Sequence, residues 1–258
     1  MSSSIPFITI EPRAPHTHTL IFLHGRGDNA RNFASSLLAS RTSQNTSLID
    51  SFPSFRFVFP QAPLRDVSSE AGIKWNQWFD VWNVRDFSDN EQLQSVGLKE
   101  VVPEIQKIIY QEAVTLDGRW DKVFLAGISM GAATSVHVLF NLDGVVPPGT
   151  RLGGFLGFSC RCPFAGRDLG GMRQALGLQG AEDGAKNGVL RGTPVLLEHC
   201  VDDPLVLVQS GRGLRDTLRG FEMEVEWKEY PNGGHWFNSP MGMDDAVEFL
   251  RRRVGEGN

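Results

Sequence analysis

The chain has 258 residues, of which 41% are hydrophobic and 21% are charged, and its net charge at pH 7 is −5. This composition is typical of a globular protein, and the acidic balance argues against a nucleic-acid-binding surface. No apolar run approaches the roughly 20 residues that a transmembrane helix needs, so we expect no integral membrane segment.

The first residues, MSSSIPFITIEPRAP, have neither the basic n-region nor the long apolar h-region of a secretory signal. The chain has three cysteines, Cys160, Cys162 and Cys200, which is an odd number. Cys160 and Cys162 lie close together, but no second pair follows at the spacing of a zinc site. Free cysteines are typical of a reducing compartment. We therefore expect a cytoplasmic protein without a structural metal site.

Short apolar, β-branched and aromatic runs alternate with helical patterns along the chain. The predicted strands are residues 5–10, 19–23, 56–59, 122–126, 154–158, 194–198 and 225–230. The predicted helices are residues 29–40, 89–114, 130–140, 205–218 and 244–254, and Pro103 is expected to divide or kink the second. Several strands are almost wholly apolar, as in parallel strands buried on both faces. The alternation predicts one α/β domain over residues 1–258, with a mostly parallel central sheet and helices on both faces.

Two stretches interrupt this alternation. Residues 60–90 are rich in tryptophan and have the composition of a loop, which is typical of a lid or of a loop beside a binding site. Residues 166–192 are rich in glycine and have weak helical character, so we predict a surface insertion there.

A G-x-S-x-G pattern, Gly127 to Gly131, lies between a predicted strand and a predicted helix. A strand that turns directly into a helix brings two backbones close together, so the flanking residues must be small. Such a turn presents the hydroxyl of Ser129 at the carboxyl edge of the sheet, with the N–H groups of the helix start beside it. The pattern predicts a nucleophilic serine, and a plain strand-to-helix turn is the alternative.

A serine nucleophile needs a general base, and the base needs a carboxylate that orients it. Three histidines follow Ser129 in the chain. His137 lies two turns into the predicted helix and His199 ends a strand, positions that favour structural roles. His235 lies in the glycine-rich loop YPNGGHWFNSP after the last predicted strand, and we predict that it is the base.

The acid is expected in the loop after the strand at 194–198, where HCVDDPLV offers Asp202 and Asp203. Pro204 is expected to open the following helix, which would make Asp203 its N-cap. Simple helix capping is the alternative role for either aspartate.

The segment TLIFLHGRGDNA predicts an apolar strand followed by a turn in which two glycines flank Arg26. The glycines let the backbone turn so that the N–H of Arg26 faces the serine. The N–H of Met130 would be the second donor of an oxyanion hole. The side chain of Arg26 is expected to point to solvent.

Together these segments resemble the acyl-protein thioesterase/carboxylesterase branch of the α/β hydrolases, also called the phospholipase/carboxylesterase family. Six segments are similar to those of the family and follow one another in register over nearly the whole chain: IFLHGRGD, FVFPQAPLR, WNQWFD, LAGISMGAA, DDPLV and the loop that contains Gly234 and His235. The resemblance implies the α/β-hydrolase fold and a hydrolase that needs no metal or cofactor.

The resemblance also implies a role for each site residue. Ser129, Asp203 and His235 would be nucleophile, acid and base, with Asp203 chosen because the family's aspartate directly precedes Pro-Leu-Val. Arg26 and Met130 would give the two backbone donors of the oxyanion hole.

Aromatic residues in the WNQWFDVW segment are predicted to line the acyl site, namely Trp78, Phe79 and Trp82. The alternative is that they fill the rim of the core. The chain departs from the family at Met130, where glutamine is common, and at SCRCPFAG, which replaces a more apolar segment that helps to bound the acyl site.

The sequence thus predicts a serine hydrolase that cleaves acyl esters or thioesters through an acyl-enzyme intermediate. The substrate would be a small molecule or an acylated protein. A carboxylesterase of small metabolites without a depalmitoylating role is one alternative, and a non-catalytic ligand receptor on the same fold is another.

Overall fold

The computed structural model describes residues 4–178 and 188–255, and its centre is a seven-stranded sheet with the order β1-β3-β2-β6-β7-β8-β9. The strands are β1 (Phe7–Ile10), β2 (His18–Leu23), β3 (Phe55–Pro60), β6 (Val123–Ile128), β7 (Gly154–Phe158), β8 (Val195–Cys200) and β9 (Val225–Tyr230). β1 pairs antiparallel with β3, and every other neighbouring pair in this sheet is parallel. The predicted mostly parallel sheet is confirmed.

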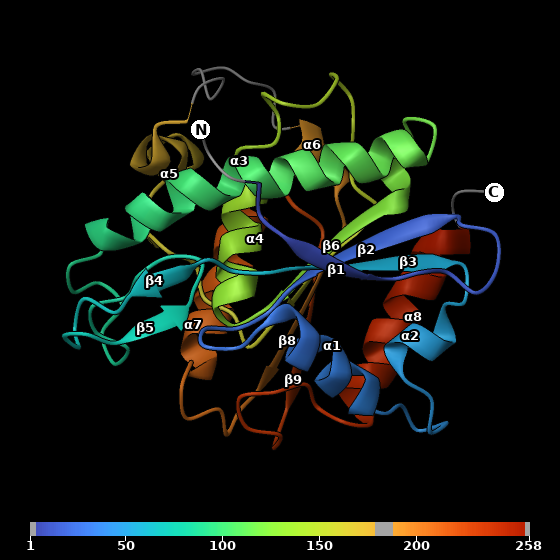
Figure 1. Ribbon diagram of the computed structural model, residues 1–258, viewed down its shortest axis with the longest axis horizontal. Helices are drawn as coiled ribbons and strands as arrows, with labels where there is room; N and C mark the ends of the chain where they lie inside the picture. Colours follow the sequence, from blue (N-terminus) through green and yellow to red (C-terminus); the bar gives the residue numbers. More distant parts are fainter. Residues whose placement is uncertain (1–3, 179–187, 256–258) are drawn as a thin grey trace.

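Helices cover both faces of the sheet, as predicted (Figure 1). The helices are α1 (Ala30–Ala39), α2 (Leu48–Ser51), α3 (Gln92–Thr115), α4 (Met130–Phe140), α5 (Leu169–Leu176), α6 (Gly188–Gly192), α7 (Val208–Gly220) and α8 (Met241–Gly255), with a 3-10 turn at Trp120–Lys122. Buried residues of α3, α4, α5 and α7 share one hydrophobic core, and those of α1, α2 and α8 share the other.

The apolar strands form because both of their faces are buried. In β2, Leu20 and Phe22 belong to the core beside α1 and α8, whereas Ile21 and Leu23 belong to the core beside α3 and α4. All four side chains are fully buried. Successive side chains of a strand point to opposite faces, so an unbroken apolar run is what a central parallel strand requires.

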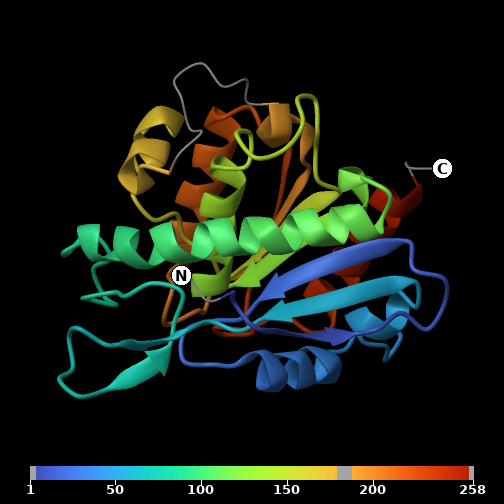
Figure 2. The ribbon, with the colours of Figure 1, turned by 45° about the horizontal axis from the view of Figure 1, so that its top comes forward.

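The carboxyl ends of the parallel strands lie at one edge of the sheet, which we call the carboxyl edge. In Figure 2 the arrows of β2 and β3 point toward this edge, and the hairpin of β4 (Leu64–Asp66) and β5 (Lys74–Asn76) lies beyond it. Chain segments that follow β2, β3, β6, β7, β8 and β9 therefore meet there. Open parallel sheets bind ligands at this edge.

Helix α3 runs without interruption through Pro103, so the predicted division of this helix is wrong. Proline removes one helical hydrogen bond and usually breaks a helix. Val101, Val102 and Ile105 are buried in the core on either side of Pro103. Tertiary packing of this face stabilises the helix more than one hydrogen bond would, because most helical stability in proteins comes from such packing.

The two stretches that interrupt the predicted alternation differ in structure. Residues 60–90 contain the β4–β5 hairpin rather than loop alone. Of the predicted surface insertion at 166–192, residues 179–187 lie outside the described residues. Its described part includes α5, where Leu169, Met172 and Leu176 are buried in the main core. Helix α5 is thus a part of the helical layer. Among the described residues, no helix is long and apolar enough to cross a membrane.

Candidate active site

Ser129 occupies the sharp turn between β6 and α4. Its backbone angles are φ 55° and ψ −123°, a combination that residues with a side chain rarely adopt. The N–H of Ser129 donates to the carbonyl of Phe158 at the end of β7 (2.9 Å), which ties the strained turn to the neighbouring strand. The strain places Ser129 at the carboxyl edge, as the G-x-S-x-G pattern requires.

The glycines on both sides of Ser129 are required by backbone contacts. A Cβ on Gly127 would lie 2.6 Å from Cα of Ala132, and a Cβ on Gly131 would lie 2.7 Å from the carbonyl carbon of Leu23. Backbone atoms cannot yield as a flexible side chain can. The turn therefore packs β6, α4 and the end of β2 together only when these two positions carry no side chain.

Asp203 and His235 come together from two loops. The carboxylate oxygen Oδ2 of Asp203 lies 2.8 Å from Nδ1 of His235, and Asp203 is buried. The other oxygen, Oδ1, accepts the backbone N–H groups of Leu205 (2.9 Å) and Val206 (3.0 Å). Helix α7 begins only at Val208, so the predicted N-cap role of Asp203 is wrong. The aspartate instead closes a tight turn before the helix, which short polar side chains favour.

A second histidine contacts the same carboxylate. His199 is fully buried, and its Nε2 lies 2.7 Å from the carbonyl of Val206 and 3.5 Å from Oδ2 of Asp203. Since a carbonyl only accepts, Nε2 of His199 carries the proton. Burial alone would raise the pKa of Asp203. Hydrogen bonds from His199, His235 and the N–H of Val206 outweigh burial and hold the pKa of Asp203 well below its usual range. Asp203 is therefore a carboxylate at neutral pH.

Asp202 organises the loop that carries His235. Its Oδ1 accepts the N–H of Gly234 (2.8 Å) and its Oδ2 accepts the N–H of Gly233 (3.3 Å). The two adjacent aspartates thus have different contacts: Asp202 binds the loop that carries His235, and Asp203 contacts the imidazole of His235. The contact joins residues about 30 positions apart in the chain, and no local sequence signal indicates it.

The turn after β2 lies directly against the serine. A Cβ on Gly25 would be only 3.6 Å from Cβ of Ser129. His24 fixes this turn, because its Nδ1 bonds the carbonyl of Gly25 (2.7 Å) and its Nε2 accepts the N–H of Ala62 (3.1 Å). The indole N–H of Trp78 donates to the carbonyl of His24 (2.8 Å). Sequence reasoning did not single out His24, whose role depends on contacts with distant residues.

The two residues that are predicted to give backbone donors, Arg26 and Met130, flank Ser129 from this turn and from the first position of α4. The side chain of Arg26 was expected to point to solvent, but it contacts other side chains instead. Its Nε donates to Oε1 of Gln77 (2.8 Å), and its guanidinium carbon lies 4.7 Å from the centre of the Trp75 ring. This contact joins the turn after β2 to the segment after β5.

The three aromatic residues that are predicted to line an acyl site differ in exposure. Trp78 and Phe79 are fully buried, whereas Trp82 is 41% exposed. Trp78 and Phe79 pack in the core beside α3. In this conformation, Trp82 is the one of the three that offers surface to an acyl chain, and the substrate-binding role of the set stays a prediction.

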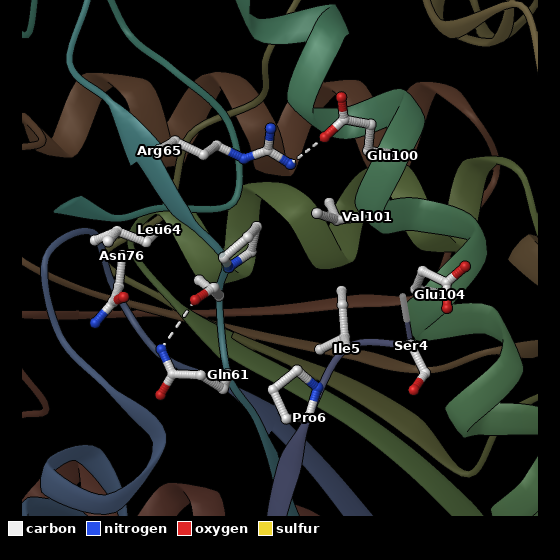
Figure 3. A pocket seen from close by; sticks show the side chains of 12 residues that line it. Ser4, Ile5, Pro6, Gln61, Leu64, Arg65, Asn76, Glu100, Val101 and Glu104 are labelled. Carbon is white, nitrogen blue, oxygen red and sulfur yellow. Dashed lines mark hydrogen bonds and ion pairs between the residues drawn. The ribbon is translucent and has the colours of Figure 1, made fainter. Parts of the chain in front are cut away.

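A pocket of about 750 Å³ lies at the β1–β3 side of the sheet. It is bounded by the first described residues, the loop after β3 and α3 (Figure 3). Arg65 and Glu100 face each other across it with a 2.6 Å contact, and Glu104 contacts Lys107 at 2.7 Å. Each of these charged side chains thus has a partner of opposite charge, although Lys107 is not among the lining residues. None of Ser129, Asp203 and His235 lines the pocket.

The described residues contain no group of three or more His, Cys, Asp or Glu side chains that could hold a metal ion. Cys160, Cys162 and Cys200 are buried free thiols. Ser129 follows β6, and the paired Asp203 and His235 follow β8 and β9, so all three lie at the carboxyl edge. A serine nucleophile with a histidine base and an orienting carboxylate needs these three groups.

Comparison with known proteins identifies the chain's relatives. The phospholipase/carboxylesterase family matches residues 5–254. Acyl-protein thioesterase 1 of Gibberella zeae is 27% identical over 263 residues, which cover 100% of this chain and 99% of that protein. Acyl-protein thioesterase 1 of Mycosarcoma maydis is 29% identical and covers 98% of both chains.

Solved structures support the fold. The crystal structure of Zea mays acyl-protein thioesterase 2 superposes with a TM-score of 0.73 at 24% identity, over 97% of this chain and 99% of that one. The structure of esterase PE8 gives a TM-score of 0.67 at 21% identity, over 96% and 98% of the two chains. The predicted α/β-hydrolase fold is confirmed.

Proposed function

The chain belongs to the phospholipase/carboxylesterase family of α/β hydrolases, and we propose that it hydrolyses acyl esters or thioesters with Ser129 as nucleophile, His235 as base and Asp203 as acid. The observation that carries the assignment is the 2.8 Å contact between Asp203 and His235 at the edge where Ser129 sits on its strained turn. Relatives named acyl-protein thioesterase 1 support an acyl substrate.

The reaction follows from these positions. His235 takes the proton of the Ser129 hydroxyl as its oxygen attacks the acyl carbonyl, and the tetrahedral oxyanion is stabilised by the backbone N–H groups of Arg26 and Met130. Collapse expels the alcohol or thiol, which receives the proton from His235. Water then attacks the acyl-enzyme with His235 again as base, which releases the carboxylic acid and restores Ser129.

Asp203 acts through His235. With Nδ1 of His235 donating to the carboxylate, Nε2 is free to accept the proton of the serine. The carboxylate also stabilises the imidazolium that forms. The free, buried cysteines support the expected reducing, cytoplasmic location.

A fluorophosphonate probe tests the assignment of the nucleophile. We expect the probe to label the native protein once per chain, and Ser129→Ala to abolish labelling and lower ester turnover by at least about 10⁴-fold. Ser159→Ala is the matched control, because Ser159 directly follows the neighbouring strand β7 and its buried hydroxyl has no hydrogen-bond partner among the described residues. Labelling that survives in Ser129→Ala would overturn the assignment.

A further inference from the structure

Arg161 lies at the carboxyl edge, in the segment that follows β7. It is three residues beyond Phe158, whose carbonyl accepts the N–H of Ser129 (2.9 Å). The side chain of Arg161 is only 7% exposed. A buried guanidinium is therefore held beside the strand end that supports the nucleophile.

The contacts of Arg161 are with neutral groups. Its Nη2 donates to the amide oxygen of Gln94 (2.7 Å), and its guanidinium carbon lies 3.9 Å from the centre of the Phe87 ring and 5.7 Å from that of Phe79. Within residues 4–178 and 188–255, Gln94 is its one hydrogen-bond acceptor, and no carboxylate is within ion-pair distance of it. A guanidinium has five N–H donors, so one amide leaves most of its capacity unused.

Neighbouring groups do not neutralise the charge. Glu91 attracts Arg161 only from a distance and pairs with Arg167 instead (3.3 Å). Burial raises the pKa of the Cys162 thiol to about 12 and that of Cys160 still further, so both flanking thiols are neutral. Burial lowers the pKa of Arg161 to about 10, which leaves it a cation at pH 7.

Another buried arginine shows what a purely structural role looks like in this protein. Arg173 is also 7% exposed, but its Nη2 contacts Oδ2 of Asp143 (2.8 Å) and its Nε donates to the carbonyl of Phe140 (2.6 Å). Buried charges are normally paired in this way, because an isolated one is costly. Arg161 is as buried as Arg173, but no carboxylate of the described residues pairs with it.

We propose that Arg161 is a specificity-determining residue that binds a carboxylate on the far end of the substrate's acyl group, so that the enzyme prefers half-esters or half-thioesters of short dicarboxylic acids. This inference rests on the proposed hydrolysis at Ser129. A carboxylate matches the planar fork of a guanidinium and would supply the missing counter-charge.

The backbone from Phe158 to Arg161 guides the choice of acyl group. Three residues span at most about 10 Å of extended chain, so a diacid of four to six carbon atoms is the length to test first. Hydrolysis adds water across the acyl C–O or C–S bond and releases the dicarboxylate and the alcohol or thiol, with no further reactant.

A matched pair of substrates tests the proposal. The 4-nitrophenyl monoester of adipic acid carries a free carboxylate, and the 4-nitrophenyl methyl diester of the same acid is neutral and of nearly equal length. For the native protein we expect kcat/KM to be about 10- to 100-fold higher for the monoester, the ratio that a charged hydrogen-bonded contact gives. Arg161→Gln should lose this preference and leave turnover of the diester within about threefold of the native value.

Arg191→Gln is the control, because Arg191 is an exposed arginine that pairs with Glu222 and lies before β8, so its loss should leave both rates unchanged. A second measurement needs no variant, since free adipate should inhibit the native enzyme competitively at lower concentration than hexanoate does. Equal rates of the native enzyme on the two esters, or equal losses on both in Arg161→Gln, would overturn the inference and make Arg161 a structural clamp for Gln94.

The probe separates this failure from a failure of the proposed function. If Ser129 is labelled and the monoester is cleaved no faster than the diester, the proposed hydrolase function is retained and the proposed specificity of Arg161 is wrong. If Ser129 is not labelled and neither ester is cleaved, the proposed function and the proposed specificity are both wrong.

Discussion

The carboxyl edge has two sides, which we propose to be a catalytic side and a substrate side, and they are built differently. On the catalytic side, Ser129 owes its position to two flanking glycines and a strained turn, and Asp203 to hydrogen bonds with residues two and three positions along the chain. On the substrate side, the contacts join Arg26 to Gln77, Trp78 to His24 and Arg161 to Gln94, which are 51, 54 and 67 positions apart. The turns that carry Ser129 and Asp203 are thus specified mainly by local geometry. The contact of Asp203 with His235, which lies 32 positions along the chain, depends on tertiary structure, as do the contacts of the substrate side.

This difference teaches where related hydrolases can diverge. Local geometry tolerates little change, because a Cβ at either Gly127 or Gly131 would meet backbone atoms. Tertiary contacts between side chains can be exchanged one pair at a time while the turn stays intact. Substrate preference can therefore change while the chemistry is retained.

The largest expected effect separates the two adjacent aspartates of the catalytic side. Asp203→Asn should lower kcat by about 10⁴-fold, the loss measured for the same change in the serine-protease triad, because an amide cannot fix the tautomer of His235 or stabilise its imidazolium. Asp202→Asn keeps one acceptor for the N–H groups of Gly233 and Gly234 and should cost less than about tenfold. Steady-state kinetics on one ester would rank them, and the opposite order would make Asp202 the acid.

The next effect tests whether local geometry fixes the nucleophile turn. Gly131→Ala forces a Cβ against the carbonyl of Leu23 and should lower the free energy of unfolding by about 1–3 kcal/mol. Gly213→Ala in helix α7 is the control, because a Cβ there meets no atom of the described residues within 4 Å and should raise stability by about 0.5–1 kcal/mol. Urea unfolding measures both, and equal stabilities of the two variants would contradict the steric account of the turn.

The smallest effect compares two tryptophans of the substrate side. Trp82→Ala should lower kcat/KM progressively with acyl length, by at most about 0.8 kcal/mol for each methylene that the exposed indole covers. Trp78→Phe removes the N–H that holds the carbonyl of His24, so it should lower the rate on acetyl and octanoyl esters by the same factor. Equal losses on both esters in Trp82→Ala would remove Trp82 from the acyl site.

The same contrast explains which features the sequence could predict. The seven strands and the G-x-S-x-G turn follow from apolar runs and from glycine spacing, which are local. The start of α7 was misplaced because Asp203 forms a turn of its own before the helix. Of the two effects predicted for Pro103, division of the helix is wrong because packing outweighs one lost hydrogen bond, and a kink stays a prediction.

The roles of His24, Gln77 and Asp202 could not be predicted, since each depends on a partner that only folding brings close. Burial of Trp78 likewise depends on tertiary contacts with the turn after β2 and with α3. A tryptophan-rich segment alone does not show which indole faces the core and which faces a ligand.

The most direct test of the proposed site is a crystal structure of the protein after reaction with a fluorophosphonate. We predict phosphorus bonded to Oγ of Ser129, with the phosphonyl oxygen within about 3 Å of the backbone nitrogens of both Arg26 and Met130. Phosphorus on another residue, or a phosphonyl oxygen that contacts neither nitrogen, would contradict the account.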